Sequence, residues 1–267
     1  MQTATRKAAA ACWSSPAAAL TGTAALRAGA GKLVIATPQS AAQAVALAVP
    51  EARVIALPES SDGGPTFYAL PLLQPLSAAT AALVVGPGMM GREATLSFVQ
   101  TILPMFRQST VVLDALAMDC VRALARFEQP VILTPHAGEM AHLTGGEKED
   151  LQEEPLAAAL RHAQAWNAVL ALKGPTTVIA GPQRQCWSHS AYAPGLGTSG
   201  SGDVLAGLIA GLAARGAAPE QAAVWGVALH ARAGQALASR QGVVGYLARE
   251  LSAEVPAIMH ALAAPAP

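Results

Sequence analysis

A turn rich in glycine and hydroxyl residues runs directly into a helical stretch at residues 197–216, GTSGSGDVLAGLIAGLAARG. Such a turn exposes backbone N–H groups, and the start of the helix adds the positive end of its dipole. Both features suit a phosphate group or a developing oxyanion. The segment is not a P-loop, since no Gly-Lys-Ser or Gly-Lys-Thr follows. It is also not a Gly-x-Gly-x-x-Gly after the first strand, which disfavours dinucleotide binding of the Rossmann type.

Asp203 stands at the start of this helical stretch. On one interpretation it only complements the helix dipole, as many N-terminal acids do. On the other it is a general base that takes the proton from a substrate hydroxyl as a phosphoryl group arrives. The glycines on both sides of it favour the second interpretation, because a capping residue needs no such backbone freedom.

The elements that must position these residues follow from the hydrophobic pattern. Short apolar, β-branched runs alternate with alanine-rich helical stretches, which predicts a largely parallel sheet with helices on both faces. Strands are expected at 32–37, 53–57, 82–86, 110–115, 130–134, 169–173 and 176–181, and helices at 17–29, 39–49, 91–106, 116–127, 138–144, 155–167, 203–215, 219–239 and 247–263. No internal repeat or long linker divides the chain, so we expect a single domain. The segment 58–75, rich in Pro, Gly and Ser, is the best candidate for a mobile loop.

Glycines and polar residues follow four of the predicted strands. They are Gly86 and Gly88, Asp114, residues 134–136 and residues 173–174. Each has a plain structural explanation when taken alone, as a turn, a cap or a loop histidine. Because ligands of an open parallel sheet bind beyond the carboxyl ends of its strands, the four together predict a site at one edge.

The composition narrows the class of protein. Hydrophobic residues make up 52% of the 267 residues and charged residues 13%, which does not suit a disordered chain. Lys and Arg number 17, as do Asp and Glu, so no basic excess points to nucleic acid or a membrane surface. No stretch approaches the roughly 20 apolar residues of a membrane span. Cys12, Cys120 and Cys186 form no CxxC or Cys/His cluster, so we expect no zinc site and a cytoplasmic location.

The motifs taken together resemble the ADP- or ATP-dependent NAD(P)H-hydrate dehydratases of the ribokinase-like superfamily, over about residues 15–250. The segments that carry the resemblance are RAGAGKLVIAT (27–37), VVGPGMMG (84–91), VVLDALAM (111–118), VILTPHAGEM (131–140), LALKGPTTVIAG (171–181), residues 197–216 and, more weakly, AVWGVALHARAG (223–234). Other ribokinase-like enzymes share the GxGD element but not its combination with TPHxGE and KGxxT. The resemblance implies an α/β fold, a three-layer α/β/α sandwich with a mostly parallel central sheet, in one domain over 1–267.

The implied activity is a repair reaction. Such enzymes phosphorylate the hydroxyl of the S epimer of NADH or NADPH hydrate, and loss of phosphate restores NAD(P)H. Bacterial members of the family generally use ADP as the phosphoryl donor, and eukaryotic members use ATP. The resemblance also implies Mg²⁺ that bridges the oxygens of the donor. It further implies a homotetramer. The residues themselves decide neither between ADP and ATP nor between the two hydrates.

The resemblance also assigns roles residue by residue. The residues that match the nucleotide site are Lys173, Gly174, Pro175, Thr176, Thr177, Gly200 and Gly202, the last two within a turn, 197–202, that would hold the phosphate as an anion hole. The residues that match the hydrate site are Asp203, His136, Gly88 (or Gly86) and Ala18 (or Ala17). Asp203 is the expected base. Glu139 matches an acid that would hold Mg²⁺ through water, and we expect no direct protein ligand to the metal.

The chain departs from the family pattern near its start. Residues 1–14 supply no convincing Gly-rich turn where the family has a further strand and such a turn, so we expect the first strand to be missing or degenerate. This region borders the hydrate pocket. Ala193 and Ala137 replace the Asn of an Asn-Pro-Gly and the second Pro of TPHPGE.

Two alternatives stay open. A ribokinase-like kinase for a vitamin-precursor alcohol would share Asp203 and the glycine turn but release a stable phosphate ester; TPHAGE and KGPTT argue against it. A non-catalytic nucleotide-binding protein would follow from a missing first strand, but such a sensor has no need for Asp203.

Overall fold

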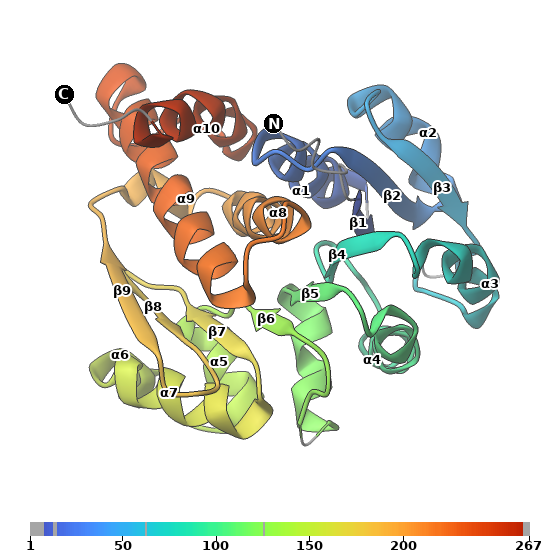
Figure 1. Cartoon of the computed structure of the whole chain (residues 1–267), viewed down its shortest axis with the longest axis horizontal. Coiled ribbons are helices and arrows are strands. Elements are labelled where there is room, and N and C mark those ends of the chain that lie inside the picture. The colour runs from blue at the N-terminus through green and yellow to red at the C-terminus, as the bar shows by residue number, and fades with distance from the viewer. Residues whose placement is uncertain (1–7, 13–14, 62, 125, 264–267) are drawn as a thin grey trace.

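The computed structural model describes residues 8–12, 15–61, 63–124 and 126–263, and these form one twisted sheet covered by helices on both faces (Figure 1). The strands are β1 (Ala8–Cys12), β2 (Lys32–Pro38), β3 (Arg53–Leu57), β4 (Thr80–Val85), β5 (Thr110–Leu113), β6 (Val131–Leu133), β7 (Val169–Leu172), β8 (Thr176–Ala180) and β9 (Cys186–Ser190). Their order in space is β3-β2-β1-β4-β5-β6-β7-β8-β9. All neighbours from β3 to β7 are parallel, whereas β8 and β9 add antiparallel strands at one edge.

The helices divide between the two faces. They are α1 (Ser15–Arg27), α2 (Gln39–Ala48), α3 (Leu70–Leu73), α4 (Arg92–Ile102), α5 (Ala137–Thr144), α6 (Lys148–Glu153), α7 (Pro155–Trp166), α8 (Ser201–Ala214), α9 (Pro219–Gln241) and α10 (Ala248–Ala263). Helices α1, α2, α8, α9 and α10 cover one face, and α3 to α7 cover the other (Figure 1). The expected three-layer α/β/α sandwich with a mostly parallel sheet is therefore confirmed.

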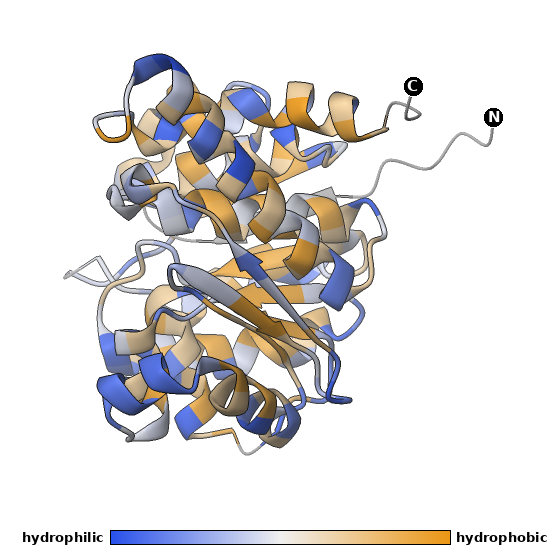
Figure 2. Cartoon of the chain, turned by 90° about the vertical axis from the view of Figure 1, so that its left-hand side faces the viewer, coloured by the Kyte–Doolittle hydropathy of each residue, from blue (hydrophilic) through white to orange (hydrophobic). Residues whose placement is uncertain are grey.

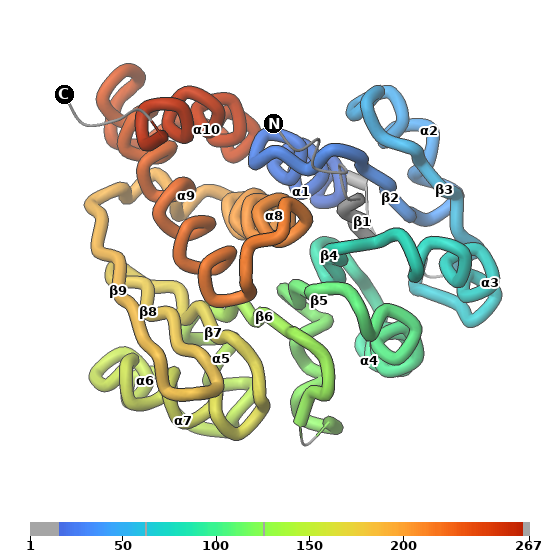
Figure 3. Tube along the Cα trace, in the orientation of Figure 1, coloured from blue at the N-terminus to red at the C-terminus, as the bar shows by residue number. Residues whose placement is uncertain are grey.

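The core lies between the sheet and these two helical layers, where Figure 2 shows apolar strands enclosed by more polar outer surfaces. Strands β5, β6 and β7 contribute side chains to both faces, as their continuous apolar sequences predict. Helix α8 is buried along almost its whole length and lies beside α1, as the trace in Figure 3 shows. A Cβ on Gly207 would lie 2.2 Å from the Thr21 carbonyl oxygen, so the close approach of the two helices requires glycine there.

The first strand was expected to be missing or degenerate; it is not missing, and its sequence is degenerate. Residues Ala8–Cys12 form β1, which pairs in parallel with β2 on one side and β4 on the other. Its AAAAC sequence has no β-branched residue, so pairing on both sides, rather than local propensity, holds it as a strand. Residues 13 and 14, part of the stretch where the family's Gly-rich turn was sought, lie outside the described residues.

Three other expectations need correction. The helix expected at 116–127 is a 3₁₀ helix over Ala115–Arg122. The helix expected at 91–106 is α4 followed by a 3₁₀ turn over Leu103–Phe106, where Pro104 has no N–H to continue the α-helical ladder. The second half of the segment 58–75 forms short helical turns and buries Ala69 and Leu73. No helix in the described part of the chain has the length and apolarity needed to cross a membrane.

Candidate active site

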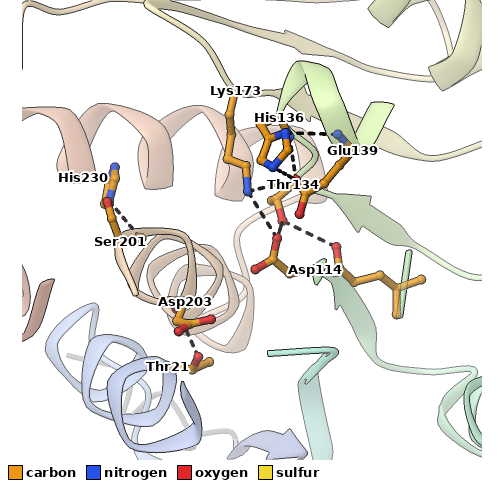
Figure 4. A network of polar contacts seen from close by, with 10 residues as sticks. Thr21, Asp114, Thr134, His136, Glu139, Lys173, Ser201, Asp203 and His230 are labelled. Carbon is orange, nitrogen blue, oxygen red and sulfur yellow. Dashed lines mark hydrogen bonds and ion pairs between the residues drawn. The ribbon is translucent and has the colours of Figure 1, made fainter. Parts of the chain in front are cut away.

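The carboxyl ends of β5, β6 and β7 bring three polar side chains into contact (Figure 4). Asp114 follows β5, Thr134 follows β6 and Lys173 follows β7. The Thr134 hydroxyl donates to Asp114 Oδ1 at 2.8 Å, and Lys173 Nζ lies 3.4 Å from the same oxygen. The polar residues that the sequence places after separate strands therefore do meet at one edge of the sheet.

The charge of Lys173 is held by two carboxylates. Besides Asp114, which is only 4% exposed, Glu139 Oε2 lies 3.6 Å from Lys173 Nζ. Burial works against the charged form, but the attraction of Asp114 and Glu139 outweighs it and raises the pKa of Lys173 above its ordinary value. Lys173 is therefore a permanent cation at this edge.

The Gly-Pro-Gly turn after β4 explains how Asp114 reaches its place. Gly86 has a φ of +120°, and a Cβ there would lie 1.8 Å from the Asp114 carbonyl oxygen. Only glycine permits this approach, which brings the end of β5 directly against the turn. Ala115, the residue after Asp114, takes the left-handed conformation with a φ of +47°, so the chain bends sharply just beyond the carboxylate.

His136 and Glu139 form a capping box at the start of α5. Glu139 N–H donates to His136 Nδ1 at 3.0 Å, and His136 N–H donates to Glu139 Oε2 at 2.7 Å. Because Nδ1 accepts, a neutral His136 carries its proton on Nε2. Lys173 N–H donates to the Pro135 carbonyl at 2.8 Å, so the TPHAGE and KGPTT loops are tied together by backbone and by charge.

The glycine turn delivers backbone donors to the same place. Gly200 takes the left-handed conformation with a φ of +85° and ends the turn, and α8 begins at Ser201. The N–H groups of Gly202 and Asp203 are in the first helical turn and have no carbonyl one turn before them within α8. A Cβ on Gly202 would lie 3.5 Å from Lys173 Nζ, so this first turn faces the lysine.

Asp203 is partly buried beside these groups. Burial, and then the negative charge of Asp114, raise its pKa from 3.8 to about 6, against an opposing effect of Lys173. The Thr21 hydroxyl of α1 donates to the Asp203 backbone carbonyl at 3.1 Å and ties the start of α8 to α1. A carboxylate with a pKa near 6 is ionised at neutral pH yet basic enough to take a proton, which suits a general base.

The other residues of the predicted nucleotide site surround Lys173. Gly174 and Pro175 are exposed between β7 and β8, and Thr176 and Thr177 begin β8. The Thr176 hydroxyl lies 2.7 Å from Ser190 Oγ on β9, and the Thr177 hydroxyl donates to the Gly174 carbonyl at 3.4 Å. The loop thus presents a lysine and exposed backbone at the open end of the sheet.

The predicted hydrate contacts lie in different surroundings. Gly88, with a φ of +69°, lies in the turn after β4, close to Gly86. His136 is exposed. Ala18 is 1% exposed and packs in an apolar cluster with residues of β2 and α2, so the structure gives it no contact with the polar site. Its role stays a prediction, as do those of the other site residues.

The sequence predicts Thr134 at this edge but not the hydrogen bond of its hydroxyl to Asp114. Two residues that contact the start of α8 are not predicted from the sequence. Thr21 and His230 carry no local signal, because each reaches α8 from another helix. His230 does fall within the weaker motif at 223–234.

The described residues contain no group of three His, Cys, Asp or Glu side chains arranged to hold a metal ion. The site nevertheless fits a cation that arrives with phosphate groups. Among the described residues that these contacts join, Asp114, Glu139 and Asp203 are carboxylates and Lys173 is the cation, so ionised Asp203 leaves the site negative. An anionic nucleotide would need an accompanying cation in these surroundings.

The family model described as NAD(P)H-hydrate dehydratase matches residues 14–257. The chain belongs to this family. It is 48% identical over 243 residues to an ADP-dependent (S)-NAD(P)H-hydrate dehydratase of Xanthomonas campestris, covering 91% of this chain and 83% of the relative. It is 41% identical over 248 residues to the bifunctional NAD(P)H-hydrate repair enzyme of Moorella thermoacetica, covering 91% of this chain and 46% of the relative, so it spans about half of that protein.

Among solved structures, the fold matches that of the ADP/ATP-dependent NAD(P)H-hydrate dehydratase of Bacillus subtilis, which was co-crystallised with ATP and Mg²⁺. The TM-score is 0.79 at 30% identity, and the match covers 96% of this chain and 90% of the other. The family and the fold expected from the motifs are both confirmed.

Proposed function

We propose that this chain is an ADP-dependent (S)-NAD(P)H-hydrate dehydratase. The observation that carries the proposal is the convergence at one edge of the sheet of Lys173, the first turn of α8 at Gly202, and Asp203, whose pKa is about 6. Membership of the family supplies the substrate class, and the relative from Xanthomonas campestris carries the matching name.

Asp203 acts as the base in the first step. The hydrate hydroxyl oxygen attacks the terminal phosphorus of the nucleotide, its proton passes to the Asp203 carboxylate, and the bond to the leaving AMP oxygen breaks. Phosphoryl transfer needs alignment and charge stabilisation more than covalent help. The phosphate then leaves the ring carbon with the electron pair of the C–O bond, and loss of a proton from the neighbouring carbon restores the double bond of NAD(P)H.

The turn 197–202 acts as the anion hole. The amides of Gly202 and Asp203 and the positive end of the α8 dipole face the moving phosphate, and Lys173 adds a fixed positive charge. Residues 173–177 hold the nucleotide, together with Gly200 and Gly202. Mg²⁺ would supply the remaining charge neutralisation, and Glu139 is the residue that would hold it, through water.

The hydrate binds on the side of Gly88 and His136, and Ala18, in helix α1, is the remaining residue of its site. The proposal extends to one domain over 1–267, a cytoplasmic location and a homotetramer. The homotetramer is supported by three large side chains that are exposed on the chain, which further copies would cover. They are Trp187 on β9, Tyr192 near it and Trp225 on α9.

The test is recovery of absorbance at 340 nm from purified (S)-NADH hydrate with Mg²⁺ and either ADP or ATP. We expect recovery that depends on the nucleotide and is lost in Asp203→Asn. A stable phosphate ester formed from a different alcohol would favour a kinase instead. Nucleotide binding without turnover would favour the non-catalytic alternative.

A further inference from the structure

His230 of α9 contacts the first residue of α8, on the side away from Lys173 and Asp114 (Figure 4). Its Nε2 lies 2.9 Å from the Ser201 hydroxyl oxygen and 3.0 Å from the Ser201 carbonyl oxygen. Ser201 is only 4% exposed, so the contact is shielded from water. None of the roles assigned above uses this histidine.

The geometry decides which ring nitrogen carries the proton. A carbonyl oxygen only accepts hydrogen bonds, so His230 must donate from Nε2 to bond the Ser201 carbonyl. Burial lowers the pKa of His230 to about 4; the bond to Ser201 opposes this shift, and the positive charge of Lys173 adds to it. His230 is therefore neutral at physiological pH and keeps a single, fixed donor toward α8.

The Ser201 carbonyl belongs to the same peptide unit as the Gly202 N–H. A trans peptide is planar, and its C=O and N–H point in opposite directions. A donor that fixes the carbonyl therefore fixes the direction of the amide on the other side of the unit. Hydrogen bonding at the carbonyl also polarises the peptide and strengthens its N–H as a donor. Gly202 lies beside Lys173, since a Cβ there would be 3.5 Å from the ammonium nitrogen, and as the second residue of α8 its N–H points out of the start of the helix.

We propose that His230 is a positioning residue for phosphoryl transfer, which holds the Ser201–Gly202 peptide so that the Gly202 N–H points at the transferred phosphate. This role rests on the proposed function. His230 touches neither nucleotide nor hydrate; it acts through the peptide bond that it holds.

Two substitutions at this position separate the hydrogen bond from the packing. His230→Leu keeps a side chain of similar bulk without a donor, whereas His230→Gln keeps an N–H donor close to the place of Nε2. We expect His230→Leu to lower kcat about tenfold or more, because an oxyanion donor that is wrongly aimed loses part of its effect, while the KM for the hydrate changes little. His230→Gln should recover most of kcat.

A matched control is His162→Leu, which removes another partly buried histidine, on α7, on the face of the sheet opposite α8 and α9. It should leave kcat unchanged. The ¹⁵N–¹H signal of Gly202 gives a readout independent of turnover: binding of ADP should shift it in the wild type and in His230→Gln, and much less in His230→Leu.

The outcomes separate this inference from the function on which it rests. A wild-type protein that binds ADP but forms no NADH would overturn the proposed function, and the Gly202 signal would still test the role of His230. An active enzyme in which His230→Leu matches the wild type in kcat and in the Gly202 shift would overturn the inference alone. Equal losses of kcat in the Leu and Gln variants would show that packing, not the donor, matters, and would also overturn it.

Discussion

The raised pKa of Asp203 predicts a specific loss of activity in acid. The base works only when ionised, and its pKa is about 6 rather than the ordinary 3.8. At pH 7 about nine-tenths of the molecules carry the Asp203 carboxylate, and at pH 5 only about one-tenth. The kcat/KM for the hydrate should therefore fall about tenfold between pH 7 and pH 5. With an ordinary pKa of 3.8, the same change would cost less than about 10%.

The sign of the shift can be tested by removing its causes. Asp114 raises the pKa of Asp203 and Lys173 lowers it. Asp114→Asn should therefore move the acid limb to lower pH, and Lys173→Met should move the Asp203 titration to higher pH. Glu128→Gln, which changes an exposed acid on the surface, should leave the midpoint where it is.

The assay is kcat/KM for (S)-NADH hydrate from pH 5 to pH 8 at saturating nucleotide, followed as early release of phosphate. The nucleotide phosphate also titrates near pH 6, so its contribution must be recognised. It appears equally in every variant, whereas the Asp203 limb moves with Asp114 and Lys173. Titration of ¹³C-labelled aspartate carboxyls in the protein without nucleotide gives the Asp203 pKa directly, even where Lys173→Met abolishes turnover.

A carboxyl signal for Asp203 with a midpoint near pH 4, together with a flat activity profile down to pH 5, would show that the pKa of Asp203 is not raised and that its ionisation does not limit the reaction. A midpoint near pH 6 that does not move in Asp114→Asn would show that the charge of Asp114 does not raise the pKa of Asp203 and that burial alone does.

Three further predictions follow from the same contacts. Asp203→Asn should raise the melting temperature at pH 7. Because the pKa of Asp203 is raised in the native state, the wild-type protein loses stability as pH rises through about 6, by roughly 1 kcal/mol for this partly exposed group. The difference in melting temperature between the variant and the wild type should vanish at pH 4 in thermal melts. Gly202→Ala should fold normally, because its Cβ meets ordinary contacts at 3.5 and 3.8 Å, but calorimetry should show ADP binding weakened about tenfold or more, since the methyl faces Lys173. Gly207→Ala should lower the free energy of unfolding by about 2–3 kcal/mol in urea titrations, because a Cβ 2.2 Å from a carbonyl of α1 forces the two helices apart; wild-type stability would contradict the packing described.

The strand ends show what could be predicted from the sequence. Asp114 and Lys173 are 59 residues apart, yet each directly follows an apolar strand of a parallel sheet. Because parallel strands end at one edge, their meeting follows from the pattern alone. The glycine turn and the place of Asp203 at the start of a helix could also be predicted from the sequence, because a helix start and its free N–H groups are local features.

The elements that sequence reasoning missed depend on contacts between distant segments. Strand β1 is four alanines and a cysteine, and only pairing with β2 and β4 makes it a strand. Strand β9 is an exposed edge strand with no apolar run to predict it. The contact of His230 with Ser201 depends on how α9 packs on α8, which no local spacing reports.

The most direct test of the proposed activity is the stoichiometry of a single turnover, with enzyme in excess over (S)-NADH hydrate and ADP. We expect one NADH, one AMP and one inorganic phosphate for each hydrate consumed, and none of the three in Asp203→Asn. AMP formed together with a phosphate ester that persists, or NADH formed without consumption of ADP, would contradict it.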